Sequence, residues 1–239
     1  RRLNSLTVKD SYPLPHIQDT LGTRGGCKHL CTMDLASGFW QIPMAEDDKE
    51  KTAFVTREGL YEFNTMPFGL CNAPATFERV MENVLRGLNW SVCSVYIDDI
   101  VVVGASVLET IQRLTLVWEK LRGAGLLLKP AKCNLFRKSV TFLGHTVDEH
   151  GISTDPLKIT ALTDRPRPRS VEDLRSFLGL AGYYRDHIPD FADVAAPLTE
   201  LTKKTTQWRW GQDEEKAYQG LIKALTGDTI LAHPRVDEG

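Results

Sequence analysis

The chain has 239 residues, and its formal net charge of −2 excludes a uniformly basic protein that coats nucleic acid. No run of about 18 apolar residues occurs, and no basic segment followed by an apolar one is present, so neither a membrane span nor secretion is indicated. The five cysteines lack a complete paired metal spacing, and we interpret them as reduced thiols of an intracellular protein.

The first part of the chain alternates short apolar segments with helical patterns. Residues 30–34 predict a strand that ends at Asp34, followed by a break at Ser37-Gly38. Residues 54–63 predict a hairpin with Gly59 in its turn. Pro74 predicts the start of a helix, whose apolar stripe we interpret as core. The stripe consists of Phe77, Val80, Met81, Val84 and Leu85.

The same alternation continues towards the C-terminus. Residues 92–103 predict a second hairpin, and the helix that follows places Ile111, Leu114, Trp118 and Leu121 on one face and ends near Gly123 and Gly125. Two prolines exclude a regular helix or central strand at residues 164–169. Ser170 then predicts the N-cap of another helix, with apolar positions at Leu174, Phe177, Leu178, Ala181 and Tyr184.

The second hairpin carries two adjacent acids, Asp98 and Asp99, inside an otherwise apolar run. Asp is depleted in strands, and neighbouring carboxylates repel each other unless a cation lies beside them. The pattern predicts Mg²⁺ as this cation, because Mg²⁺ prefers oxygen ligands. The alternative is an acidic hairpin turn, since Asp is a common turn residue. Asp34 favours the metal, because two strands that end in acid can converge on two ions, which activate a 3′-hydroxyl and stabilise pyrophosphate.

Several segments follow one another in the order and spacing of one family, and the match covers nearly the whole chain. The sequence resembles the reverse transcriptase of the Ty3/gypsy class of LTR retrotransposons. The segments are Arg2-Leu3-Asn4, Ser11-Tyr12-Pro13-Leu14-Pro15, Asp34-Leu35-Ala36-Ser37-Gly38-Phe39-Trp40-Gln41-Ile42, Lys51-Thr52-Ala53-Phe54, Met66-Pro67-Phe68-Gly69-Leu70-Cys71-Asn72-Ala73-Pro74-Ala75-Thr76-Phe77, Tyr96-Ile97-Asp98-Asp99 and Phe142-Leu143-Gly144-His145.

The resemblance implies an α+β right-hand polymerase fold. Its palm would be ferredoxin-like, with an antiparallel sheet backed by helices in the order β-α-β-β-α-β, beside partial fingers and a mostly helical thumb. Partial fingers and palm would span residues 1–150, the thumb residues 151–206, and the start of a connector towards an RNase H domain residues 207–239. The chain opens without Met, and we expect it to be a piece, with more of the fingers upstream and RNase H downstream.

The implied activity is that of an RNA-directed DNA polymerase, a nucleotidyltransferase fragment of a retrotransposon Pol polyprotein. Its partners would be an RNA or DNA template with primer, dNTPs, two Mg²⁺ ions, with Mn²⁺ as a substitute, and flanking RNase H, protease and integrase domains. The family further implies a cytoplasmic location in a virus-like particle and ribonuclease H activity outside this chain. The alternative is an inactive retroelement remnant or a domesticated nucleic-acid-binding module. The sequence leaves the oligomeric state open.

The resemblance also assigns roles at the catalytic centre. Asp34 and Asp98 would bridge both ions with Asp99 near them, and Lys132 would lie near the departing pyrophosphate, where a cation stabilises charge or donates a proton. Phe39 matches the position beneath the incoming sugar, where its ring would clash with a 2′-hydroxyl. The alternative for Phe39 is an ordinary core aromatic. The floor of the nucleotide pocket would be formed by Pro67, Phe68 and Gly69.

Two further sets of residues would contact the primer–template. Leu143, Gly144 and His145 resemble a primer-grip hairpin, in which glycine permits close approach of the backbone to the primer. His145 could equally be an exposed strand histidine, and we do not interpret it as a metal ligand. Basic residues after position 165 would grip phosphates, or else form a solvated helical surface. Those assigned to the nucleic-acid backbone are Arg169, Arg175, Lys203 and Lys204.

Overall fold

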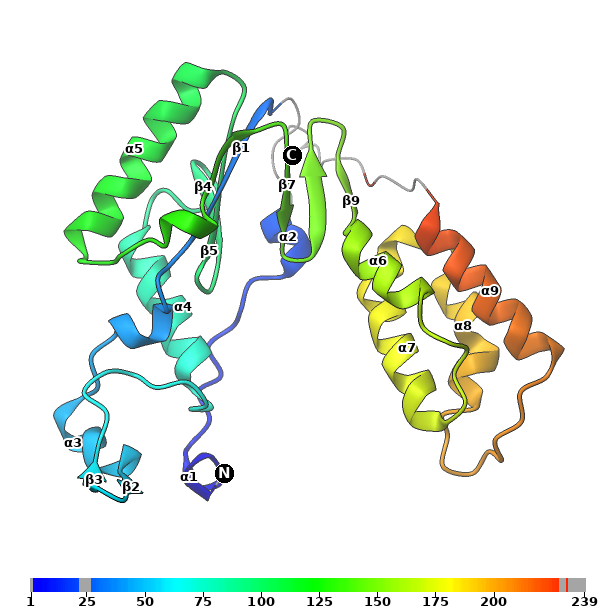
Figure 1. The fold of residues 1–239 in the computed structure, drawn as a ribbon. Coiled ribbons are helices and arrows are strands. Elements are labelled where there is room, and N and C mark those ends of the chain that lie inside the picture. Colours follow the sequence, from blue (N-terminus) through cyan, green and yellow to red (C-terminus); the bar gives the residue numbers. More distant parts are fainter. Residues whose placement is uncertain (1, 22–26, 228–230, 232–239) are drawn as a thin grey trace. The chain divides into compact units, whose positions relative to one another are not determined.

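The computed structural model describes residues 2–21, 27–227 and 231, and the chain forms two compact units, Arg1–Leu143 and Gly144–Gly239 (Figure 1). The division falls within the predicted primer grip, a few residues before the expected palm boundary at residue 150. The assignment of residues 1–150 to fingers and palm, 151–206 to the thumb and 207–239 to the connector stays a prediction. Among the described residues, none of the helices combines the length and the apolar character needed to cross a membrane.

The first unit is built around a four-stranded antiparallel sheet with the strand order β4-β5-β1-β6. In chain order its main elements are β1 (His29–Asp34), α4 (Ala73–Val84), β4 (Cys93–Tyr96), β5 (Asp99–Gly104), α5 (Val107–Gly123) and β6 (Asn134–Arg137). This is the β-α-β-β-α-β order of a ferredoxin-like domain. The predicted α+β fold with a ferredoxin-like palm is therefore confirmed.

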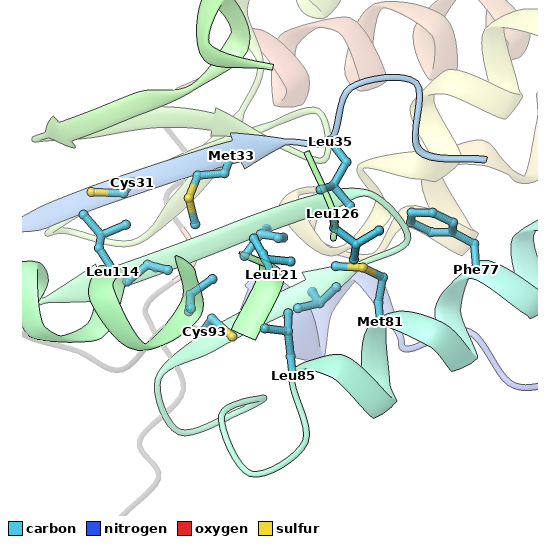
Figure 2. Packing of buried hydrophobic residues seen from close by; sticks show 14 of the residues in the cluster. Cys31, Met33, Leu35, Phe77, Met81, Leu85, Cys93, Leu114, Leu121 and Leu126 are labelled. Carbon is cyan, nitrogen blue, oxygen red and sulfur yellow. The ribbon is translucent and has the colours of Figure 1, made fainter. Parts of the chain in front are cut away.

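Both helices contribute to one apolar core with the sheet (Figure 2). The predicted stripe of α4 is buried at Phe77 and Met81, and Leu85 continues it just beyond the helix. These side chains pack with Cys31 and Met33 of β1. Successive side chains of β1 point to opposite faces of the sheet, so every second residue of the strand joins this cluster. The core thus fixes α4 against the strand that ends at the first acid.

The buried face of α5 differs from the predicted one. Ile111 is 47% exposed and Trp118 is 41% exposed, although the indole nitrogen of Trp118 lies 3.1 Å from Met33 Sδ. The residues that this helix buries are Thr110, Leu114, Val117 and Leu121. These residues are spaced by four, three and four positions, so they also lie on one face of a helix. The predicted face contained the larger side chains of Ile111 and Trp118, whereas the helix encloses the smaller Val117 where it packs against the sheet.

Short elements complete the first unit. The predicted hairpin is present as β2 and β3, but Gly59 begins β3 and pairs with Thr56, so Arg57 and Glu58 form the turn. The short elements are α1 (Arg2–Leu6), α2 (Ile17–Leu21), 3-10 helices at Gly38–Gln41, Glu50–Thr52 and Pro130–Lys132, α3 (Glu46–Lys49), β2 (Phe54–Thr56), β3 (Gly59–Tyr61) and β7 (Ser139–Phe142).

The second unit is mostly helical, as predicted for a thumb. Its elements are β8 (His145–Asp148), β9 (Ile152–Thr154), α6 (Pro156–Thr163), α7 (Val171–Tyr183), a 3-10 helix at Arg185–His187, α8 (Phe191–Glu200) and α9 (Gln212–Thr226). Ser170 caps α7 by accepting a hydrogen bond from the Asp173 amide, as expected, and residues 164–169 form no regular helix or strand. Helix α9, in the predicted connector, shares a core with α7 and α8.

Candidate active site

Three carboxylates meet where the central strands of the sheet end. Asp34, the last residue of β1, is the register partner of Asp99, the first residue of β5. Directly opposed residues of antiparallel strands have Cα atoms about 4.5–5.5 Å apart. The pairing of Tyr96 with Asp99 leaves Ile97 and Asp98 as a two-residue turn. The expected convergence of two acid-ended strands is thus present in the register of the sheet.

The turn that carries Asp98 has an unusual backbone. Ile97 has a φ of 55°, in the left-handed region that β-branched residues rarely adopt. A positive φ at the first position of a two-residue hairpin turn is typical of type II′, where glycine is the usual residue. The Ile97 N–H donates to Glu78 Oε2 of α4 at 2.7 Å. Glu78 was not among the site residues predicted from the sequence, although its spacing with Met81 and Leu85, i, i+3 and i+7, places it on the apolar stripe.

The electrostatics of the cluster combine burial with like charge. Lys132 Nζ lies 2.7 Å from Asp34 Oδ2, and this hydrogen bond raises the pKa of Lys132. Burial, followed by the charges of Asp98 and Asp34, raises the pKa of Asp99 to about 6. Burial is also the main cause that raises the pKa of Asp98. One ammonium therefore faces three carboxylates, which leaves the site in need of further positive charge.

The donor set fits a hard divalent cation, because it consists of carboxylate oxygens that repel one another. Within the described residues, however, no group of three or more His, Cys, Asp and Glu side chains is arranged as a ready metal cage. Lys132 donates a hydrogen bond to one oxygen of Asp34, and the carboxylate has further lone pairs with which to bind a cation. Such an open arrangement suits Mg²⁺, which typically takes one or two carboxylates and completes its coordination with water and substrate phosphates.

Phe39 lies in the 3-10 helix that follows β1 and is partly buried. Its ring packs edge-on against Phe77 of α4 with centroids 5.5 Å apart, and it tilts against Phe68 at 5.4 Å. Phe68 is 62% exposed. The ring of Phe39 thus joins the core on one side and the predicted pocket floor on the other, which is compatible with both readings of this residue.

Asn4, to which the sequence had assigned no role, forms hydrogen bonds with the segment of the predicted pocket floor. Asn4 Nδ2 donates to the carbonyl of Gly69 at 2.7 Å, and the Cys71 amide donates to Asn4 Oδ1 at 3.0 Å. Pro67 is buried and Gly69 is exposed with a φ of 93°. The only sequence signal for this clamp was the position of Asn4 in a family motif.

The predicted primer-grip residues lie where the two units join in the sequence. Leu143 and Gly144 both have positive φ, of 46° and 68°. A Cβ at Gly144 would lie 2.1 Å from Lys158 Nζ, so the space beside this glycine is taken by a lysine. His145 is buried, with ring centroids 5.2 Å from those of Tyr183 and Tyr184. The alternative of an exposed strand histidine is therefore wrong, and the primer-grip role stays a prediction.

The predicted phosphate-binding residues are all exposed in the second unit: Arg169, Arg175, Lys203 and Lys204. Two of them make local contacts. Arg175 Nη2 donates to the carbonyl of Thr202 at 2.8 Å, and Lys203 forms an ion pair with Glu200, three residues before it. These contacts fit both the phosphate-binding reading and the alternative of a solvated helical surface.

Known proteins resemble this chain in sequence. The family model described as reverse transcriptase (RNA-dependent DNA polymerase) matches residues 1–147. The retrovirus-related Pol polyprotein from transposon 297 of Drosophila melanogaster is 44% identical over 235 residues, which cover 98% of this chain and 22% of that polyprotein. The Pol polyprotein from transposon gypsy of the same organism is 37% identical over 246 residues, covering 98% and 24%. The chain thus spans about a fifth to a quarter of these relatives.

Solved structures resemble it in fold. A foamy viral protease-reverse transcriptase in complex with dsDNA aligns with a TM-score of 0.88 and 26% identity, covering 99% of this chain and 50% of that one. The corresponding complex with RNA/DNA hybrid aligns with a TM-score of 0.86 and 26% identity, covering 98% and 32%. With the paired acids at the end of the sheet and the match over residues 1–147, the chain belongs to the reverse transcriptase (RNA-dependent DNA polymerase) family.

Proposed function

We propose that this chain carries the nucleotidyl-transfer centre of a gypsy-type retrotransposon Pol polyprotein and extends a primer with dNTPs on an RNA or DNA template. The observation that carries the proposal is the register partnership of Asp34 with Asp99, with Asp98 in the adjoining turn. Family membership implies the use of divalent metal ions in general. The matched foamy viral structures, which contain dsDNA or RNA/DNA hybrid, support a primer–template as the partner.

In this proposal Asp34, Asp98 and Asp99 hold two Mg²⁺ ions, with Mn²⁺ as a substitute. The bound ions would lower the pKa of the primer 3′-hydroxyl and neutralise charge on the reacting phosphates. Lys132, like any lysine, is protonated at physiological pH, and Asp34 raises its pKa further. Its ammonium therefore supplies positive charge or a proton to the departing pyrophosphate.

The remaining roles concern substrate placement. Phe39 excludes a 2′-hydroxyl by the bulk of its ring, above a pocket floor of Pro67, Phe68 and Gly69. The primer would lie along residues 143–145, and the basic residues of the second unit would contact phosphates. We further propose that protease, integrase and RNase H domains flank this segment in the polyprotein, and that the polyprotein acts in a cytoplasmic virus-like particle.

Two variants of the polyprotein that contains this chain separate chemistry from binding. Asp98→Asn keeps the side-chain size and removes a formal charge, so primer extension should be lost while primer–template affinity is kept or rises. Changing Lys203 and Lys204 together to Ala should weaken duplex binding and flatten its dependence on salt, with extension preserved at saturation. The matched control replaces Lys120 and Arg122, at the exposed end of α5, and should leave the salt dependence unchanged.

The decisive measurement is primer extension by the wild type in Mg²⁺ and in Mn²⁺. If the wild type binds primer–template tightly and extends nothing with either ion, the polymerase proposal is wrong, and the chain is a nucleic-acid-binding module. If Asp98→Asn extends primers as fast as the wild type, the assignment of the acidic turn to catalysis fails.

A further inference from the structure

Glu78 is a buried acid on the apolar face of α4, and its surroundings explain only part of its presence. Its exposed fraction is 0%. Oε2 accepts the Ile97 N–H at 2.7 Å, whereas Oε1 has no hydrogen-bond partner within the described residues. Phe77 and Met81, on the same face of the helix, are equally buried and apolar. A carboxylate thus occupies a position at which packing alone would favour an apolar side chain.

This arrangement is unfavourable for stability. Burial raises the pKa of Glu78, and the nearby Glu82 carboxylate raises it further, while the Ile97 N–H opposes both. A buried polar atom without a partner carries its full desolvation cost. A methionine of similar length would fill the space without that cost. The presence of Glu78 is therefore better explained by the hydrogen bond that Oε2 accepts from Ile97 than by the stability of the helix.

The group that Glu78 holds is the peptide leading into the acidic turn. Ile97 has a φ of 55°, which is strained for a β-branched side chain and persists only where the surroundings enforce it. The next residue is Asp98, and the one after it begins β5 opposite Asp34. An acceptor fixed on a packed helix is a rigid anchor for that peptide, since α4 belongs to the same core as the sheet.

We propose that Glu78 is a positioning residue for the proposed polymerase centre: its buried carboxyl clamps the Ile97 amide and so fixes where Asp98 and Asp99 present their oxygens. The expected effect on catalysis rests on the proposed function, whereas the contact between Glu78 and Ile97 rests on geometry alone. Small displacements of catalytic carboxylates lower rates steeply, because the reacting groups must be held within a fraction of an ångström.

The test compares Glu78→Gln, which keeps an acceptor oxygen, with Glu78→Met, which keeps the length and removes it, in the full polyprotein. We expect kcat for primer extension within about threefold of wild type for Gln, and roughly ten- to a hundredfold lower for Met, because the Ile97 N–H loses its acceptor. The primer–template affinity should stay within about threefold in both, because the residues proposed to contact the duplex lie outside this turn.

Two further variants separate positioning from general destabilisation. Met81→Ala removes a buried side chain of the same helix face and should lower the melting temperature while leaving kcat unchanged well below it. Ile97→Gly, combined with Glu78→Met, should recover at least roughly tenfold in kcat, because glycine adopts positive φ without an external clamp. Equal losses for Gln and Met, or a loss of kcat in Met81→Ala that matches that of Glu78→Met, would overturn the proposal.

A structural measurement keeps this inference distinct from the proposed function. The hydrogen-exchange rate of the Ile97 amide, measured by NMR in the 239-residue chain, should rise at least roughly tenfold in Glu78→Met and stay near wild type in Glu78→Gln. If the wild-type polyprotein extends no primer, the polymerase proposal fails. The exchange rate of the Ile97 amide still tests whether Glu78 holds that amide. If the Ile97 amide exchanges equally in both variants, the clamp is wrong even where the polymerase is active.

Discussion

His187 should make the stability of the second unit sensitive to mild acid. The side chain is 2% exposed, and neither ring nitrogen has a hydrogen-bond partner among the described residues. Its ring stacks on that of His145 at 5.5 Å and meets Tyr184 edge-on at 5.9 Å. Burial lowers the pKa of His187, which outweighs the opposing effects of the Ile152 backbone and Asp186. The folded protein therefore resists protonation that the unfolded chain accepts.

The direction and size of the pH effect on stability follow from this difference in proton binding between the folded and unfolded states. Because the unfolded state binds more protons below its ordinary pKa of about 6.5, the stability is complete above that pH and is lost as the pH falls below it. The loss between pH 7.5 and pH 5.0 is at most about 2 kcal/mol, which is the limit for a side chain that takes up no proton in the folded state. His187→Met removes the titrating group at similar volume and should flatten this part of the pH dependence.

The assay is urea denaturation between pH 5.0 and 7.5, followed by tryptophan fluorescence. Trp208 and Trp210 pack against the core of the second unit, so the three tryptophans of the first unit are replaced by Phe to make the signal specific. Those three are Trp40, Trp90 and Trp118. Curves for wild type and His187→Met that stay parallel within about 0.5 kcal/mol across this range would contradict a role of His187 in the pH dependence, because additivity at distant sites holds within that error.

Two further substitutions test the first unit. Phe39→Val should raise the ratio of ribonucleotide to deoxynucleotide incorporation roughly ten- to a hundredfold without changing metal binding; an unchanged ratio would show that Phe39 serves only to pack against Phe77. Leu121→Ala, at a fully enclosed position of α5, should lower the free energy of unfolding by about 2–5 kcal/mol in urea denaturation, whereas Leu108→Ala on the exposed face of the same helix should change it by less than about 0.5 kcal/mol.

The local parts of the fold were accessible from the sequence. The strand ending at Asp34, the acidic hairpin and the cap at Ser170 each depend on a few neighbouring residues, and each is present. The buried face of α5 was not accessible in the same way. Trp118 and Val117 are both apolar, and only the packing of the helix on the sheet decides which of them is enclosed.

At the candidate site, the sequence identified the acids but not what positions them. The partnership of Asp34 with Asp99 follows from two strands being neighbours, which no local pattern specifies. Glu78 and Asn4 act on backbone groups far away in the chain, on Ile97 and on the loop at Gly69. Hydrogen bonds from a side chain to a distant backbone leave little trace in composition, so such residues are found only once the fold is known.

Gly38 lies close to both Phe77, whose ring supports Phe39, and the acidic turn, and it leaves no room for a side chain. A Cβ at this position would lie 2.8 Å from Phe77 Cζ and 3.3 Å from Asp98 Cβ. The same Phe77 ring supports Phe39. A single methyl group there would therefore press on the ring that supports Phe39 and on the turn that carries Asp98 together. Under the roles proposed for Phe39 and Asp98, a change at position 38 would alter sugar selection and turnover together, so the two properties would not vary independently.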